Sequence, residues 1–284
     1  MNVVDGLLDL FILILVSLVP ALIYLTWVRR TESFRREAWG PLLRAFVYGA
    51  IFATFTAAIL EGLILALGTA VSQKYPAPEF VFLNSNSTWG TFFLVLIVAP
   101  FIEEALKASG VAAHRAQITR LADGPVFGAS VGLGFGFFET FLYGLGAFLV
   151  GGLVAGIALI LVRSVSSVVL HGSSTGMFGY GYARSKFGVP GPGSGSYYLL
   201  AVAMHASFNV LASLSVIVAV LGLGTFAANA AAYIGLFAAI GFAFGAIEHV
   251  RSVIQSSDYP ALLGGARRFQ PAPARPPRPP PGSS

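Results

Sequence analysis

Long apolar runs dominate this sequence, and they restrict the chain to folds that can exist inside a lipid bilayer. A helix needs about 20 apolar residues to cross the hydrocarbon core of a membrane, and it satisfies its own backbone hydrogen bonds there. Runs of this length lie at approximately residues 6–28, 41–71, 89–111, 125–149, 153–183, 197–221 and 225–249. The sequence therefore predicts an all-α, polytopic membrane helix bundle with about seven transmembrane helices.

The composition agrees with that class and excludes several kinds of site. Apolar residues make up 56% of the 284 residues and charged residues only 10%, which is unlike a soluble domain. The chain has no cysteine, which excludes disulfides, thiolate metal ligands and a cysteine nucleophile. The formal net charge is +5, but the basic residues lie between apolar runs, where they indicate how the spans are oriented in the membrane. We therefore expect the lipid bilayer, and no nucleic acid, as a partner.

The positions of the 17 Lys and Arg residues predict how the chain crosses the membrane. Lys74 is alone in the loops on one side, and Lys107 and Arg163 fall within spans. The others flank spans on the opposite side, in residues 29–44, 115–120, 184–186 and 251–278. Because cytoplasmic loops are enriched in basic residues, we expect the N-terminus outside and the C-terminus in the cytoplasm. The chain is thus expected to be a multi-pass protein of the cell membrane.

Three regions follow from these spans. Residues 1–40 are expected to form an N-terminal transmembrane helix and a basic cytoplasmic loop, and residues 41–250 a membrane-embedded core. Residues 251–284 contain the run RRFQPAPARPPRPPPGSS, which has too few apolar residues to fold. We expect this last region to be a disordered cytoplasmic tail rich in Pro and Arg.

The fourth apolar run carries a row of small residues. One small residue recurs at every fourth position: Gly124, Gly128, Gly132, Gly136, Thr140 and Gly144. These residues share one face of a helix and allow a second helix to approach closely in lipid. We expect tight helix packing along this row, with Glu139 beside the contact.

Polar side chains from four of the runs fall at a similar depth. With a rise of about 1.5 Å per residue from the cytoplasmic end of each helix, the expected depths are about 17 Å for Glu103, about 24 Å for Glu139, about 20 Å for His171, about 14 Å for His205 and about 20 Å for Asn209. All lie in the middle of a hydrocarbon core about 30 Å thick. Ionisable residues at this depth are costly and usually functional, so the common depth predicts one shared site.

Other ionisable residues are interpreted as interfacial. Glu61 lies about 25 Å from Arg44, which we take as near the outer interface. Glu248 and His249 lie at the cytoplasmic end of the last span. Arg163 is expected to neutralise charge or to reach the outer surface.

The spacing of the buried polar residues indicates what chemistry they can perform. Glu103 lies four residues and Glu104 three residues before Lys107, so one lysine shares a helix face with two carboxylates. One lysine does not easily compensate both, so one glutamate is expected to hold a proton or to act as a base. His205 and Asn209 also share a face. Carboxylates, imidazoles and an amide can together activate a water molecule and hold an oxyanion, although each residue alone also fits a structural ion pair or hydrogen bond.

The ordered motifs resemble those of PrsW-type intramembrane proteases, relatives of the CAAX-processing membrane proteases. The motifs are Glu103-Glu104-x-x-Lys107, Phe135-x-x-x-Glu139, His171 followed by Thr175, and His205-x-x-x-Asn209. The resemblance runs from about residue 41 to residue 250. It implies a glutamic-type endopeptidase that hydrolyses membrane-anchored protein substrates, in characterised members an anti-sigma factor.

The resemblance also implies roles for the acidic residues. Glu103 would be the principal base for the attacking water, and Glu104 would support or orient it. Glu139 would take part in proton transfer, and His171 would complete the site that binds the attacking water.

The remaining motif residues are implied to stabilise charge or support the site. His205 and Asn209 would stabilise the tetrahedral oxyanion, while Lys107, Phe135 and Thr175 would be supporting residues. The serines and threonines of these motifs lack the setting of a nucleophile, so we expect no covalent acyl-enzyme.

Two other interpretations remain open from the residues. Glu103, Glu139, His171 and His205 could ligate zinc, although the chain lacks a His-Glu-x-x-His helix, and we expect no cofactor. The same residues could instead form the relay of a proton- or ion-coupled transporter. Transporters usually carry inverted repeats, which this sequence does not show, and a non-catalytic scaffold would leave the polar motifs unexplained.

Overall fold

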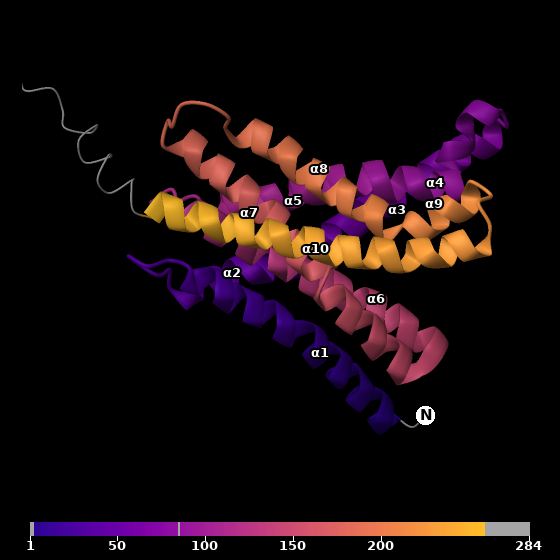
Figure 1. Cartoon of the computed structure of the whole chain (residues 1–284), viewed down its shortest axis with the longest axis horizontal. Coiled ribbons are helices and arrows are strands. Elements are labelled where there is room, and N and C mark those ends of the chain that lie inside the picture. Colours follow the sequence, from indigo (N-terminus) through magenta and orange to yellow (C-terminus); the bar gives the residue numbers. More distant parts are fainter. Residues whose placement is uncertain (1–2, 85, 259–284) are drawn as a thin grey trace, which may run out of the picture.

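The described residues are almost entirely helical (Figure 1). The computed structural model describes residues 3–84 and 86–258, and this part of the chain contains no strand. The helices are α1 (Val3–Arg30), α2 (Trp39–Val47), η1 (Tyr48–Ala53), α3 (Thr54–Lys74), η2 (Pro78–Leu83), α4 (Thr88–Phe93), η3 (Leu94–Val98), α5 (Ala99–Ala113), α6 (Asp123–Ser164), α7 (Ser167–Lys186), α8 (Ser194–Ala212), α9 (Leu214–Val220) and α10 (Thr225–Asp258). The expected all-α class is confirmed.

Five helical stretches of the described chain are long and apolar enough to cross a membrane. They are Val4–Arg30, Trp39–Lys74, Thr88–Ala113, Asp123–Lys186 and Thr225–Asp258. A sixth arises when α8 and α9, which meet at an angle of 62°, are counted as one bent span. The count of about seven is therefore not reached, because residues 123–186 form one helical stretch of 64 residues where the sequence predicts two spans.

The chain reverses within α6 at Gly152. This glycine has φ 76° and ψ −177°, a backbone conformation that residues with a Cβ rarely adopt. The two halves of α6 then pack against each other, since Phe141 and Ile160 belong to one buried apolar cluster. Figure 1 shows α6 turning back on itself at the lower right. The second half of α6 consequently returns toward the centre of the bundle and leads into α7.

The first four glycines of the predicted row, Gly124 to Gly136, form the contact between α6 and α7, and Gly144 packs against the second half of α6. A Cβ added at Gly128 would overlap the carbonyl oxygen of Thr175, and one added at Gly132 would overlap that of His171. Only glycine therefore allows the two backbones to approach this closely. The predicted tight packing is confirmed, and it places Glu139 of α6 directly beside α7.

A short π-helical segment, η3, precedes the paired glutamates of α5. The backbone N–H of Ala99 bonds to Leu94, five residues earlier, which is the π-helical register. In the same register the carbonyl of Val95 would need a donor from Pro100, which has no N–H. Asn209 of α8 supplies it, with Nδ2 at 2.8 Å from the Val95 oxygen. This bond fixes α8 against the start of α5.

The last helix is held at its end by the loops that follow α1 and α5. Asp258 accepts hydrogen bonds from the backbone N–H groups of Ser33 and Phe34, both at 2.9 Å, and from Arg120 at 2.6 Å. Because these contacts order its last turn, α10 includes the first eight residues of the expected tail, 251–258. The remainder of the predicted disordered tail, 259–284, lies outside the described residues.

Candidate active site

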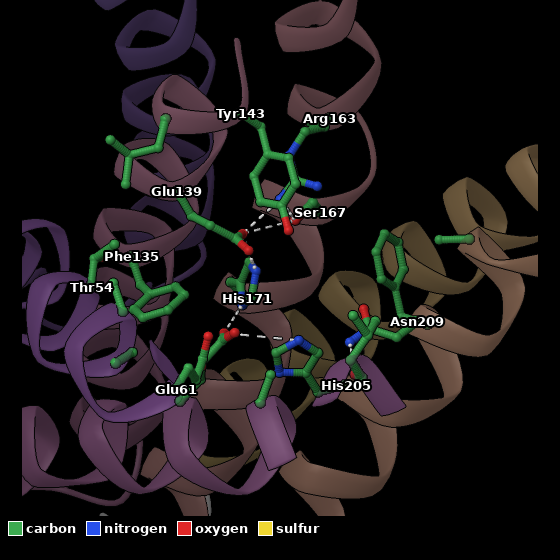
Figure 2. Close-up of a pocket in the computed structure, with 18 of the residues that line it drawn as sticks. Thr54, Glu61, Phe135, Glu139, Tyr143, Arg163, Ser167, His171, His205 and Asn209 are labelled. Atoms are coloured by element: carbon green, nitrogen blue, oxygen red, sulfur yellow. Dashed lines mark hydrogen bonds and ion pairs between the residues drawn. The ribbon is translucent and has the colours of Figure 1, made fainter. Parts of the chain in front are cut away.

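A cavity of about 350 Å³ lies where α3, η3, α5, α6, α7 and α8 meet. Figure 2 shows its polar side chains pointing inward from several helices. Six of the residues predicted from the sequence line it: Glu103, Phe135, Glu139, His171, His205 and Asn209. Glu104 and Lys107 lie directly behind this wall, and both are buried. The four motifs thus converge as their common depth predicts, with one exception.

The exception is Thr175. It lies one helical turn beyond His171 and packs against Gly128 and Gly132 of α6. Its hydroxyl is buried without a hydrogen-bond partner, and the residue does not reach the cavity wall. The sequence separation of four residues places it on the same face as His171, but that face is covered by α6 at this level.

Lys107 is the central cation of the cluster. Its side chain is fully buried, and its ammonium lies 2.8 Å from Glu104 Oε1 and 2.8 Å from His171 Nδ1. It also lies 3.6 Å from Glu103 Oε2 and 4.4 Å from the ring centre of Phe135. Phe135 therefore supports the lysine through a cation–π contact. The lysine compensates Glu104 by direct contact and Glu103 from a greater distance.

These contacts determine the tautomer of His171. An ammonium group can only donate, so His171 Nδ1 must accept from Lys107, and the ring proton must be on Nε2. His171 Nε2 lies 2.9 Å from Glu139 Oε2 and donates to it. Glu139 therefore orients His171 from the side opposite to the lysine.

The tautomer of His205 follows in the same way. Its Nδ1 lies 3.1 Å from Glu104 Oε1, which also accepts hydrogen bonds from Lys107 and Ser174. Since this oxygen is an acceptor, His205 carries a proton on Nδ1. In the neutral ring Nε2 then has a free lone pair, 3.9 Å from Glu103 Oε2.

Among the carboxylates that line the cavity, Glu139 is hydrogen-bonded, whereas Glu61 and Glu103 each have a buried oxygen without a hydrogen-bond partner. In Glu103 this oxygen is Oε2. This oxygen is 3.6 Å from Lys107 Nζ, 3.9 Å from His205 Nε2 and 4.0 Å from His171 Nδ1. Such separations are too long for direct hydrogen bonds but can be spanned by one water molecule. The arrangement offers a base to a reactant that enters the cavity.

Two residues interpreted as interfacial or peripheral belong to the cavity. Glu61 of α3 lines it, so the prediction of an interfacial position is wrong. Arg163 lines it as well and lies 2.7 Å from Glu139, in agreement with a charge-neutralising role. The sequence could have indicated this position, because the expected depth of Glu61, about 25 Å, is close to the depth of about 24 Å expected for Glu139.

The donor set of this cluster fits a divalent metal ion in type and spacing. One ligand atom each from Glu103, His171 and His205 lie within 4.8 Å of one another. Two imidazoles and a carboxylate form a common set for catalytic zinc. Glu139, a fourth candidate ligand in the sequence, instead bonds the second nitrogen of His171, as carboxylates behind metal ligands do. Lys107 donates a hydrogen bond to His171 Nδ1, and this bond would have to break before a metal ion could bind the same nitrogen.

Comparison with known proteins agrees with the motifs and with their placement. The family model described as PrsW family intramembrane metalloprotease matches residues 37–240, which cover all four motifs and every helix that lines the cavity. Neither a curated protein nor a solved structure matches the chain. Because the match spans well over half of the sequence, the chain belongs to the PrsW family of intramembrane proteases and is a multi-pass membrane protein.

Proposed function

We propose that the chain is an endopeptidase that hydrolyses peptide bonds of membrane-anchored proteins, with Glu103 as the base for the attacking water. The observation that carries this proposal is the free Oε2 of Glu103, which is buried at the cavity wall among Lys107, His171 and His205. A carboxylate without a hydrogen-bond partner retains the basicity needed to accept a proton. Family membership favours this function over an ion-coupled transporter.

The proposed reaction has two steps. Water attacks the scissile carbonyl carbon while its proton passes to Glu103, which gives a tetrahedral intermediate with a negative oxygen. Collapse of the intermediate breaks the C–N bond, and Glu103 returns the proton to the departing amine. No covalent enzyme intermediate forms in this scheme.

The oxyanion is assigned chiefly to Asn209. One N–H of its amide bonds the Val95 carbonyl, and the second N–H is left for the substrate oxygen. His205 can donate through Nε2 only when its ring is doubly protonated, because Nδ1 is committed to Glu104. The resemblance implies that both residues stabilise the oxyanion. Asn209 is therefore the main donor, and His205 contributes only when its ring is doubly protonated.

A zinc-dependent form of the same reaction is the second candidate. The lone pairs of Glu103 Oε2, His205 Nε2 and His171 Nδ1 lie close together, and such a set of acceptors favours a cation. Zinc would supply Lewis-acid polarisation and a more acidic water. Metal analysis of the purified protein, combined with chelator treatment in the cleavage assay, separates the two candidates.

The decisive test of the function is cleavage in liposomes. The purified protein is expected to release a fragment from a single-pass membrane substrate, and Glu103→Gln is expected to lower the rate by about 100-fold or more. Glu248→Gln is the matched control, since Glu248 is exposed and pairs only with Arg251 among the described residues. A Glu103→Gln enzyme that cleaves at the normal rate would show that the proposed base is wrong.

We also propose seven membrane crossings, with the N-terminus outside and the C-terminus in the cytoplasm. The reversal at Gly152 supports two crossings within residues 123–186, and the C-terminal ends of α1, α7 and α10 lie at one end of the bundle (Figure 1). Because the chain has no cysteine, single cysteines report topology cleanly. Val150→Cys is expected to react with an impermeant reagent in intact cells, and Ser196→Cys only after permeabilisation.

A further inference from the structure

Arg163 lines the cavity but belongs to none of the four motifs. Its guanidinium extends from the second half of α6 to Glu139 in the first half, with Nη2 at 2.7 Å from Oε2. The same nitrogen donates to Ser167 Oγ at 2.9 Å, and the guanidinium lies 3.9 Å from the ring centre of Tyr143. Figure 2 shows these side chains grouped around Glu139, on the side of the cavity away from His205.

We propose that Arg163 is a positioning residue for the hydrolysis, acting on His171 through Glu139. The inference rests on the proposed function and adds to it a residue that none of the motifs contains. Arg163 holds the Glu139 carboxylate in place, and Glu139 in turn holds the His171 proton on Nε2. His171 Nδ1 is thereby left as an acceptor facing Lys107 and Glu103.

One oxygen of Glu139 joins Arg163 to His171. Glu139 Oε2 accepts a hydrogen bond from Arg163 Nη2 at 2.7 Å and lies 2.9 Å from His171 Nε2. Because the guanidinium holds this oxygen in place as an acceptor, the imidazole places its proton on Nε2. A proton on Nδ1 would instead point at Lys107, which has no lone pair to receive it, and the contact of 2.8 Å would become repulsive.

Arg163 is the cation in direct contact with Glu139. An isolated carboxylate within the membrane is costly, and an adjacent guanidinium compensates it with a charge-assisted hydrogen bond. Glu61 and Glu103 line the same cavity and would repel that charge. Lys107 is already bonded to Glu104 and His171, which leaves Arg163 to compensate Glu139.

The fold offers a matched control for this residue. Arg251 forms an ion pair with Glu248 at 2.8 Å and lies 4.3 Å from the ring centre of Trp27. It therefore has the same two types of contact as Arg163 but lies outside the cavity lining. Arg163→Gln is expected to lower kcat by about 10- to 100-fold with little change in KM, whereas Arg251→Gln leaves both unchanged. Arg163→Lys, which keeps the charge, is expected to recover part of the loss.

A double-mutant cycle tests whether Arg163 acts through Glu139. If it does, Arg163→Gln combined with Glu139→Gln is no slower than Glu139→Gln alone. If the loss of cleavage rate in the double variant equals the product of the two single losses, the proposal is overturned. A raised KM with an unchanged kcat would overturn it too, because Arg163 would then bind substrate directly.

A measurement independent of activity separates this proposal from the proposed function. The chain has four histidines, so the ring ¹⁵N signals of His171 can be assigned by single substitutions. We expect the wild-type protein and Arg251→Gln to show His171 protonated at Nε2, and Arg163→Gln to lose that single tautomer. If Glu103→Gln cleaves normally the proposed function fails, yet the tautomer still tests Arg163. An unchanged His171 spectrum in Arg163→Gln would overturn the proposal.

Discussion

Lys107 determines how the residues of the cluster share charge. It bonds one carboxylate and one imidazole directly and leaves Glu103 without a hydrogen bond. The sequence predicted that one lysine would not satisfy two adjacent glutamates, and the geometry agrees. It did not reveal which glutamate would be left free, because that depends on where His171 and His205 approach α5.

The first prediction concerns the loss of this cation. Lys107→Met leaves Glu104 buried without its ionic partner, which is expected to destabilise the protein by about 3–5 kcal/mol. It also frees the His171 Nδ1 lone pair, so added zinc is expected to raise the thermal midpoint of the variant more than that of the wild type. The measurement is thermal unfolding in detergent, with and without zinc, after chelator treatment.

The outcome bears on the second candidate for the mechanism. Zinc that stabilises neither protein would contradict a metal site formed by Glu103, His171 and His205. Phe135→Leu is a suitable control, because it removes the ring contacts to Lys107 and His171 and retains the donor set.

At the scale of the helices, the sequence predicted the depth of the motif residues in the membrane well, but it predicted the rotation of each helix about its axis poorly. The fixed rise per residue placed the motif residues at one level, and the small-residue row correctly identified the α6 contact face. Rotation about each helix axis depends on packing against neighbours. Thr175 was therefore expected near a cavity that α6 closes off from it, whereas Glu61 was misplaced because its depth was interpreted as interfacial.

The second prediction tests the contact between α6 and α7. Gly132→Ala places a Cβ against the carbonyl oxygen of His171, so the helices must separate and lengthen the contact between Glu139 and His171. We expect cleavage to fall by about 100-fold, as a displacement of roughly 1 Å at a catalytic group can cause. The measurement is the rate of substrate cleavage in liposomes.

Gly146→Ala is the matched control on the same helix. Nothing lies within 4 Å of a Cβ at this position, so cleavage is expected to be unchanged. Replacing a helical glycine there should stabilise the protein by about 0.5–1 kcal/mol. An equal loss of activity in both variants would mean that α6 is simply intolerant of substitution.

At the scale of the whole molecule, a polar cluster at one end of the bundle joins segments that are distant in sequence. Arg120 contacts carboxylates after α1, at the start of α6 and at the end of α10: Glu32, Glu37, Asp123 and Asp258. All four carboxylates are buried; Glu32 and Glu37 lie between two candidate spans, whereas Asp123 begins one span and Asp258 ends another. This cluster could not be predicted from the sequence, because its members lie in loops and at helix ends whose mutual distances depend on the complete fold.

The third prediction follows from the burial of Glu32, which raises the pKa of its carboxyl to about 7, despite the opposing effects of the Glu37 amide and Arg120. Burial raises the pKa of Glu37 as well. The folded protein therefore binds more protons than the unfolded chain between about pH 4.5 and pH 7, so its stability falls as the pH rises through that window, for Glu32 by up to about 3 kcal/mol. Glu32→Gln should flatten this dependence in thermal unfolding at a series of pH values, whereas Glu248→Gln should retain it. Stability that rises across the same window would mean that Arg120 compensates Glu32 fully, and that the ends of the bundle are joined by ion pairs alone.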